Sequence, residues 1–262
     1  MIYSKDDFKL MRKASKLAMM TLDFIDEYVR AGITTEELDN LCNEFIVKNG
    51  GISACKGYSG YPKYTCISLN HVICHGIPTD KRKLHEGDIL NIDVTVIVDG
   101  FFGDTSRMYK VGKIQPVAQK LIDVTYQSLW DAILAIKPFD PLNKVGDVIS
   151  KTISKTGFSI VRDFCGHGVG RRFHEDPTVL HFKNKYSEEP LKPGMIFTIE
   201  PMINVGKPDT KTLSDGWTSV TKDHSLSAQF EHSIGITDKG VEVFTITDEE
   251  EKIYGKFLDK WN

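Results

Sequence analysis

The order of the predicted elements indicates a mixed helix-and-strand fold made of two similar halves. Apolar residues recur at helical spacing in two neighbouring segments. After them, apolar and polar residues alternate as in β-strands, and Gly and Pro residues separate the strand-like runs. This series of elements then occurs a second time. No linker, low-complexity tract or block of like charge separates the two series. We therefore expect a single domain over residues 1–262, with internal halves of about 1–112 and 113–250.

Two predicted helices open the first half, and both begin with a capping signal. Ser4 and Asp7 have the spacing of a capping box, and the apolar spacing that follows predicts a helix over residues 5–30. Thr34 and Glu37 form a second capping box, which opens the next helix. Glycines stop both helices: Gly32, Gly50 and Gly51.

The second half repeats the helix pair, and prolines mark the start and the end of its first helix. Pro116 opens the third predicted helix, because proline suits the first helical position, and Pro138 breaks it. A short helix of about residues 144–155 follows and ends at Gly157.

Composition excludes several classes of protein. The net charge of −3 and the pI of about 6.2 leave no basic face for direct nucleic-acid readout. No run of about 18 apolar residues is present, so we expect no membrane span. The five cysteines are odd in number and lack Cys-x-x-Cys spacing, which favours reduced thiols and a cytoplasmic location over a disulfide framework.

A strong hairpin signal lies in the strand region of the first half. Residues 89–98 are rich in β-branched side chains, and residues 101–109 form the returning strand. The dipeptide Asp99-Gly100 between them is typical of a two-residue turn. This turn sets the register of the two strands.

In that register two carboxylates share one face of the hairpin. Asp93 lies opposite Ser106 and Thr95 opposite Asp104, which places the two Asp residues about 7–8 Å apart at the backbone. A solvated face of an edge hairpin would explain either Asp alone. Asp is depleted in strands, however, and both interrupt apolar runs, so a metal or acid–base site is an equal alternative.

Three segments of the second half carry further residues of the metal-ligand type. His167 lies among glycines, Glu200 ends an apolar strand, and Glu231 lies between an aromatic residue and a histidine. Each alone has an ordinary explanation, as a turn histidine or an exposed strand Glu. Together with the two Asp residues they form an oxygen-rich donor set that favours Mn²⁺, Fe²⁺ or Co²⁺. Two divalent ions would balance four carboxylates and could activate a shared water.

These residues and their surroundings resemble the type I methionine aminopeptidases over about residues 4–250. The matching segments are Asn91-Ile-Asp93, Gly103-Asp104-Thr105, Gly166-His-Gly-Val-Gly170, Glu200-Pro201, Glu231-His232, Cys74-His75-Gly-Ile-Pro78 and Asp215-Gly-Trp217. The resemblance implies an α+β fold of the pita-bread (creatinase/aminopeptidase-like) type. In that fold an antiparallel sheet is flanked by helices in two pseudo-symmetric halves.

The resemblance also implies a dinuclear metal centre. Its ligands would be Asp93, Asp104, His167, Glu200 and Glu231, with Asp104 and Glu231 bridging the two ions. Asp93 would complete one metal site, and His167 with Glu200 the other. The implied reaction removes the initiator methionine from nascent proteins by attack of a metal-bridging water or hydroxide on the first peptide bond. Glu200 would act as the proton shuttle, and a small second residue would be preferred.

Two other histidines and an apolar pocket complete the implied site. His75 and His174 would contact the scissile amide and stabilise the tetrahedral intermediate; apart from the resemblance they read as a turn residue and a surface histidine. Sulfur and aromatic side chains suit a thioether, although ordinary core packing would also explain them. The implied pocket consists of Cys55, Tyr58, Tyr61, Cys66, His75, Phe173, His174 and Trp217.

Further implications concern a monovalent cation and the partners. The resemblance places such a cation near Asn70, Val72 and Ser227. It implies nascent polypeptide N-termini as substrates and transient association with the ribosome, and we expect a monomer in the cytoplasm. Two residues depart from the family pattern: His71 stands where Glu is often found, and Arg172 stands where a small residue is common.

Two other functions stay open at this point. A proline dipeptidase or aminopeptidase P would share the five ligands, but such enzymes usually carry a large extra N-terminal domain. A non-catalytic binding protein of the same fold would typically have lost ligands, and here none is lost. No N-terminal zinc-binding extension and no long insertion between His174 and Glu200 are present, which favours the bacterial-type enzyme.

Overall fold

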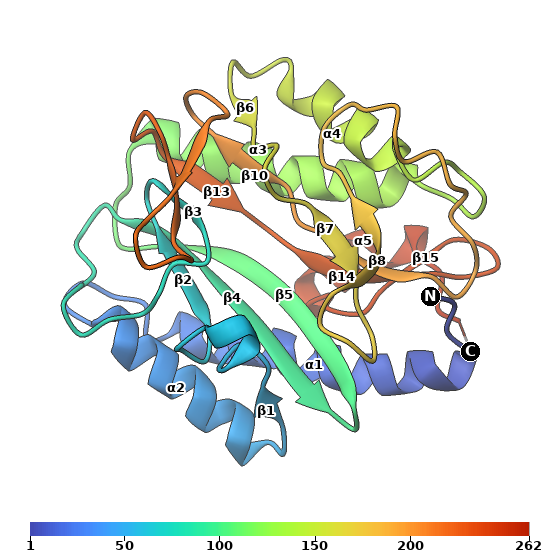
Figure 1. Cartoon of the computed structure of the whole chain (residues 1–262), viewed down its shortest axis with the longest axis horizontal. Helices are drawn as coiled ribbons and strands as arrows, with labels where there is room; N and C mark the ends of the chain where they lie inside the picture. The colour runs from blue at the N-terminus through green and yellow to red at the C-terminus, as the bar shows by residue number, and fades with distance from the viewer. Residues whose placement is uncertain (262) are drawn as a thin grey trace.

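The computed structural model describes residues 1–261 and places helices on two sides of the strands (Figure 1). The first helix pair lies along one side, and the second pair lies on the opposite side, at the bottom and top of the view (Figure 1). The helices are α1 (Lys5–Asp26), α2 (Thr35–Lys48), α3 (Pro116–Ala135), α4 (Lys144–Ile153) and α5 (Asp248–Tyr254), with two short 3₁₀ helices at Tyr58–Gly60 and Gly255–Phe257. Among the described residues, no helix is both long and apolar enough to cross a membrane.

All paired strands are antiparallel, and they form four small sheets. The strands are β1 (Ile52–Ser53), β2 (Cys66–Leu69), β3 (Val72–Cys74), β4 (Ile89–Val98), β5 (Phe101–Lys110), β6 (Ser159–Ile160), β7 (Gly166–Gly168), β8 (Glu175–Val179), β9 (Ile196–Ile199), β10 (Met202–Asn204), β11 (Thr210–Thr212), β12 (Ser219–Thr221), β13 (Ser227–Gln229), β14 (His232–Ile236) and β15 (Val241–Val243).

The sheets combine hairpins of consecutive strands with pairings between strands that are distant in the chain. In the first, β5 pairs with one edge of β4, while β1 and β2 pair with the other. The others have the orders β13-β10-β6, β11-β12-β3 and β15-β14-β9-β7-β8. An isolated bridge between Ser106 and Glu231 joins β5 to the residue before β14, so the two halves of the chain meet there.

The predicted helix starts are confirmed, and the predicted end of the first helix is wrong. Ser4 and Thr34 cap α1 and α2 through complete capping boxes. The first helix ends at Asp26 rather than near residue 30. The amides of Tyr28 and Val29 reach carbonyls only three residues back, so the chain tightens into turns after the last helical residue.

The helices of the second half also lie where they were expected. Pro116 occupies the start of α3, which ends before Pro138. The fourth helix ends at Ile153, two residues earlier than predicted, because Thr156 hydrogen-bonds back to the Ile153 carbonyl through both its amide and its hydroxyl in the turn that precedes Gly157.

The hairpin of β4 and β5 has the predicted register along its whole length. Asp93 pairs with Ser106, and Thr95 pairs with Asp104. On the other face of the hairpin Gly103 packs directly on the α1 backbone, where a Cβ atom would lie 2.3 Å from the carbonyl carbon of Ala14. This close approach anchors the carboxylate-bearing hairpin to the first helix.

Two large apolar clusters are buried in the molecule. In the first half α1 and α2 pack on β2 and β4 through residues such as Leu22, Leu38 and Ile92. In the second half α3 and α4 pack on β9, β13 and β14 around Trp130 and Phe197.

Candidate metal centre and substrate pocket

A cavity of about 350 Å³ is lined by all the residues that the sequence predicted as metal ligands, catalytic residues or substrate-pocket residues. Those residues are Cys55, Tyr58, Tyr61, Cys66, His75, Asp93, Asp104, His167, Phe173, His174, Glu200, Trp217 and Glu231. The remaining lining residues are Thr95, Asp163, Phe164, Cys165 and Met202. None of the lining residues is Lys or Arg, so the carboxylates meet no basic side chain in the cavity.

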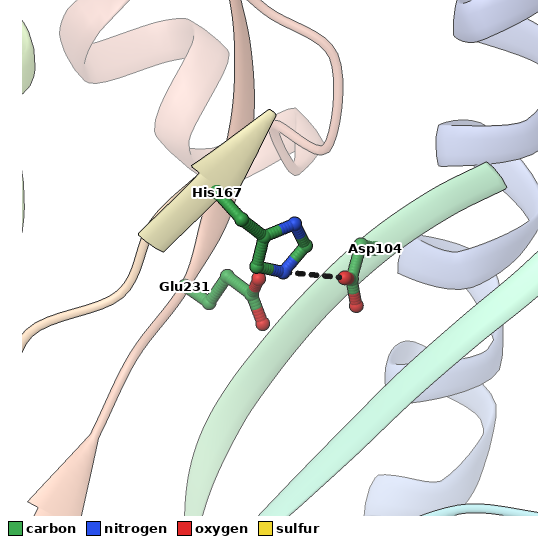
Figure 2. Close-up of side chains that lie close together, drawn as sticks. All are labelled: Asp104, His167 and Glu231. Carbon is green, nitrogen blue, oxygen red and sulfur yellow. Dashed lines mark ion pairs between the residues drawn. The ribbon is translucent and has the colours of Figure 1, made fainter. Parts of the chain in front are cut away.

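The acidic groups reach the cavity from both halves of the chain. Asp93 and Asp104 come from the β4–β5 hairpin, while Glu200 follows β9 and Glu231 precedes β14. His167 lies in β7, between them. Figure 2 shows its ring directed between the carboxyl groups of Asp104 and Glu231.

One imidazole lies within coordination range of several carboxyl groups. The Nε2 atom of His167 is 3.6 Å from Asp104 Oδ2 and 3.6 Å from Glu200 Oε1. Potential ligand atoms of Asp104, His167 and Glu231 all lie within 4.8 Å of one another. A single cation of ordinary size can therefore contact all three.

Burial shifts the pKa values of these groups against their charged forms. The pKa of Asp104 is raised to about 7, chiefly by desolvation, against hydrogen bonds from Thr95 and the Thr105 amide that lower it. Desolvation also raises the pKa values of Asp93, Glu200 and Glu231, and repulsion from the neighbouring carboxylates adds to it. Bound cations would favour the ionised carboxylates, so this donor set fits divalent metal ions.

The pKa of His167 moves in the direction that a metal ligand needs. Desolvation, followed by repulsion from His174, lowers it to about 3. The imidazole is therefore neutral near pH 7, and its contacts with Asp104 and Glu200 are not ion pairs in that state. A neutral ring nitrogen is the form that coordinates a metal.

Hydrogen bonds hold the carboxyl groups in place, and most of their donors were not predicted. Thr95 Oγ1 donates to Asp104 Oδ1 at 2.7 Å, and Thr198 Oγ1 donates to Glu200 Oε1 at 2.7 Å. Gln229 Nε2 donates to Glu200 Oε2 at 3.2 Å. Thr198 and Gln229 each precede a predicted ligand by two residues, a spacing that places strand side chains on one face and could have revealed them.

His181 is a further neighbour of this group that the sequence did not indicate. It is fully buried, and its Nε2 atom accepts a hydrogen bond from the Glu200 amide at 3.1 Å. It lies 19 residues from Glu200 in the chain, so no local spacing signals the contact.

The two non-ligand histidines flank the cavity. Burial, followed by repulsion from His174, lowers the pKa of His75 to about 4, and its backbone adopts a left-handed conformation. His174 is more exposed; its Nδ1 atom lies 2.8 Å from the Tyr58 hydroxyl, and its ring stacks on Phe173. Both rings are neutral near pH 7, since burial also lowers the pKa of His174.

The apolar side of the cavity is a compact cluster of sulfur and aromatic groups. Cys55, Tyr61 and Cys66 are buried together, with Phe173 and Trp217 packed against them. The Tyr61 hydroxyl is 2.9 Å from the Gly76 carbonyl, which fixes the ring, and the rings of Tyr61 and Trp217 meet edge to face at 5.0 Å.

The remaining predicted residues lie outside this cavity. Asn70 and Ser227 are adjacent, because the Ser227 amide donates to the Asn70 carbonyl at 2.8 Å, and Val72 begins the neighbouring strand β3. Arg172 is exposed and precedes Phe173 without lining the cavity itself.

The fold and the cavity together are those of a metal-dependent peptidase. The profile of metallopeptidase family M24 matches residues 9–238. The methionine aminopeptidase of Escherichia coli (strain K12) is 50% identical over 250 residues, which cover 95% of each chain. The chain therefore belongs to metallopeptidase family M24, among the bacterial type I methionine aminopeptidases, and is a hydrolase with the pita-bread fold.

Solved structures agree with this assignment. The crystal structure of methionine aminopeptidase from Rickettsia prowazekii matches with a TM-score of 0.92 and 48% identity, over 94% of this chain and 99% of that one. The enzyme from Thermotoga maritima also gives 0.92, with 36% identity over 94% of this chain and 99% of that one. The prolidase from Pyrococcus furiosus shares the fold alone, at 23% identity and a TM-score of 0.75; the match covers 94% of this chain and 66% of that one.

Proposed function

We propose that the chain removes the initiator methionine from nascent proteins through a dinuclear metal centre, with a preference for a small second residue. One observation carries the proposal. Four carboxyl groups and an imidazole converge in a cavity without basic side chains, and the opposite wall of that cavity is sulfur-rich and aromatic. The first wall suits divalent cations, and the second suits a thioether side chain.

The proposed metal ligands are Asp93, Asp104, His167, Glu200 and Glu231, with Asp104 and Glu231 shared between two ions. The raised pKa values of the four carboxyl groups support this assignment, since burial destabilises their charges unless cations are present. Oxygen-rich ligands with one imidazole suit Mn²⁺, Fe²⁺ or Co²⁺. When bound, such ions polarise a carbonyl group and lower the pKa of a water molecule.

Glu200 is the proposed proton shuttle. The shorter hydrogen bond, from Thr198, holds Oε1, and the longer one, from Gln229, leaves Oε2 the freer atom. Oε2 would accept a proton from the attacking water and return it to the leaving amine.

His75 and His174 are proposed to contact the reacting amide. Their depressed pKa values keep both rings neutral, so each ring can donate one N–H group. Donors placed before the reaction stabilise the negative charge that develops on the carbonyl oxygen. The first side chain of the substrate would lie against Cys55, Cys66 and Trp217.

Location, partners and the monovalent cation belong to the same proposal. We propose a cytoplasmic monomer that acts on nascent N-termini close to the ribosome. The adjacent segments of Asn70, Val72 and Ser227 are the proposed site of a monovalent cation.

Two peptides tested side by side decide between this function and its nearest rival. The protein is stripped with chelator, restored with Mn²⁺ or Co²⁺, and incubated with Met-Ala-Ser and with a Xaa-Pro dipeptide. We expect metal-dependent release of methionine that is lost in Asp104→Asn. Cleavage of the Xaa-Pro peptide alone would overturn the pocket assignment, and cleavage of neither with metal bound would favour a binding protein.

A further inference from the structure

Two histidines outside the catalytic cavity face each other across neighbouring turns. His71 lies in the turn between β2 and β3, and His224 lies in the segment between β12 and β13. Their ring centres are 5.5 Å apart, and the ring planes are tilted by 55°. Within residues 1–261 neither ring has a hydrogen-bond or ion-pair partner, and neither residue lines the catalytic cavity.

A separation of 5.5 Å between ring centres is compatible with two imidazoles that share one metal ion. With metal–nitrogen bonds of about 2.0–2.1 Å and tetrahedral angles, two coordinated rings have centres about 5 Å apart. Two imidazoles in direct stacking contact would lie closer. We propose that His71 and His224 form a second metal site, which binds one Zn²⁺, Cu²⁺ or Ni²⁺ ion through both imidazoles, with water in the remaining positions.

The backbone already holds the two turns together. The Thr221 amide donates to the His71 carbonyl at 2.9 Å, and Val72 pairs with Val220. His224 adopts a left-handed backbone conformation with φ of 59°, which is uncommon outside glycine. The pair is therefore preorganised, so binding an ion requires little further ordering of the chain.

The charged side chains of Arg82 and Asp223 already have partners, so the two imidazoles are the ligands available to an ion. Arg82 is the positive charge that acts on His71, but it is paired with Asp88 at 3.3 Å. The Asp223 carboxylate is occupied by the amides of Lys207 and Ser225.

The chemistry of the pair differs from that of the catalytic donor set. Imidazole nitrogens without carboxylates favour Cu²⁺, Ni²⁺ and Zn²⁺ over Mn²⁺. The site would also clamp strand β3, which continues directly into Cys74 and His75. A bound ion should therefore raise the thermal stability of the protein, because it binds the folded state alone.

Zinc titration followed by NMR of the histidine ring nitrogens tests the site directly. Zn²⁺ is first added to full-length protein until the catalytic ligands are saturated, and the addition then continues. We expect the His71 and His224 signals to shift together at the same Zn²⁺ concentration. In His224→Asn the His71 signal should no longer shift, and in His71→Asn the His224 signal should stay unchanged.

His85→Asn is the matched control, because its side chain is 69% exposed and lies in another loop. This variant should retain the paired shift and the same number of bound Zn²⁺ ions, whereas each variant of the pair should bind one ion fewer. A shift of one ring without the other, or no shift of either at millimolar Zn²⁺, would overturn the proposal. Equal zinc stoichiometry in all variants would overturn it as well.

Discussion

At the scale of the residue, the hydroxyl of Thr198 holds two proposed metal ligands at once. It accepts a hydrogen bond from the His167 amide at 3.0 Å and donates one to Glu200 Oε1 at 2.7 Å. Thr198→Val keeps the shape and removes both bonds. Because such supporting contacts orient the ligands, we expect Mn²⁺ affinity or kcat/KM to fall by about 10–100-fold.

A competitive-chelator titration and steady-state kinetics measure the two quantities. Thr198→Ser retains the hydroxyl and should stay close to the parent enzyme. If Val and Ser variants behave alike, the hydroxyl does not orient Glu200.

Tyr3 connects the N-terminal segment to the loop that carries His174. Its hydroxyl donates to Glu175 Oε1 at 2.6 Å and accepts from the Arg171 amide at 2.9 Å. The other carboxyl oxygen of Glu175 has no partner within residues 1–261. Tyr3→Phe would leave this carboxylate enclosed without a donor, so we expect the free energy of unfolding to fall by about 1–3 kcal/mol.

Chemical denaturation of the variant measures this loss, and kcat should fall with it because Glu175 adjoins His174. Tyr186→Phe removes a hydroxyl from a side chain that is 87% exposed and should change neither quantity. An unchanged kcat in Tyr3→Phe would show that the N-terminal segment does not position the His174 loop.

At the scale of the element, the contact between α1 and β5 depends on one glycine. A Cβ atom at position 103 would lie 2.3 Å from the Ala14 carbonyl carbon and 2.4 Å from the Ser15 amide. Backbone cannot move aside as a flexible side chain can. We expect Gly103→Ala to lower the free energy of unfolding by about 1–3 kcal/mol or more, as measured in urea.

Lys110→Ala, at the exposed end of the same strand, serves as the comparison and should stay within about 0.5 kcal/mol of the parent. A Gly103→Ala protein as stable as Lys110→Ala would mean that the helix and the hairpin are not in close contact. Because Gly103 adjoins Asp104, a displaced hairpin should also weaken metal binding.

The hairpin was predictable because its determinants are local. The Asp99-Gly100 turn set the register, and the register placed Asp93 and Asp104 on one face. The end of α1 was not predictable in the same way. Apolar residues such as Val29 continue past Asp26, but they pack in a turn rather than in a helix.

At the scale of the whole molecule, metal removal should make the stability of the protein fall as the pH rises towards 7. In the metal-free protein the pKa of Asp104 rises from 3.8 to about 7, so the folded state binds more protons than the unfolded state between these values. Its stability should therefore be greatest near pH 4 and fall as the pH rises to about 7. Asp93, Glu200 and Glu231, whose pKa values are also raised, add to the effect.

Unfolding curves across this pH range, with chelator and with Mn²⁺, measure the difference. The metal-loaded protein should lack the decline, because bound cations stabilise the ionised carboxylates. Parallel pH dependence in the two forms would contradict the proposed ligand set.

The sequence predicted most of the residues that line the cavity, but it did not predict the buried residues that support them. Residues with distinctive chemistry, such as His167 among its glycines, carry a signal of their own. Supporting residues such as His181 and Tyr3 have no unusual neighbours in the sequence, and only the folded chain brings them to Glu200 and Glu175. The ligand roles and the two-half organisation stay predictions that await the experiments above.

The meeting of the two halves at Ser106 and Glu231 has a bearing on biosynthesis. The Thr105 hydroxyl donates to the Glu231 carbonyl across 126 positions of the chain. A polypeptide emerging from its own ribosome can form the β4–β5 hairpin early, yet it lacks Glu231 until nearly all of it has been translated. A chain that stops before Glu231 should therefore lack one of the proposed metal ligands.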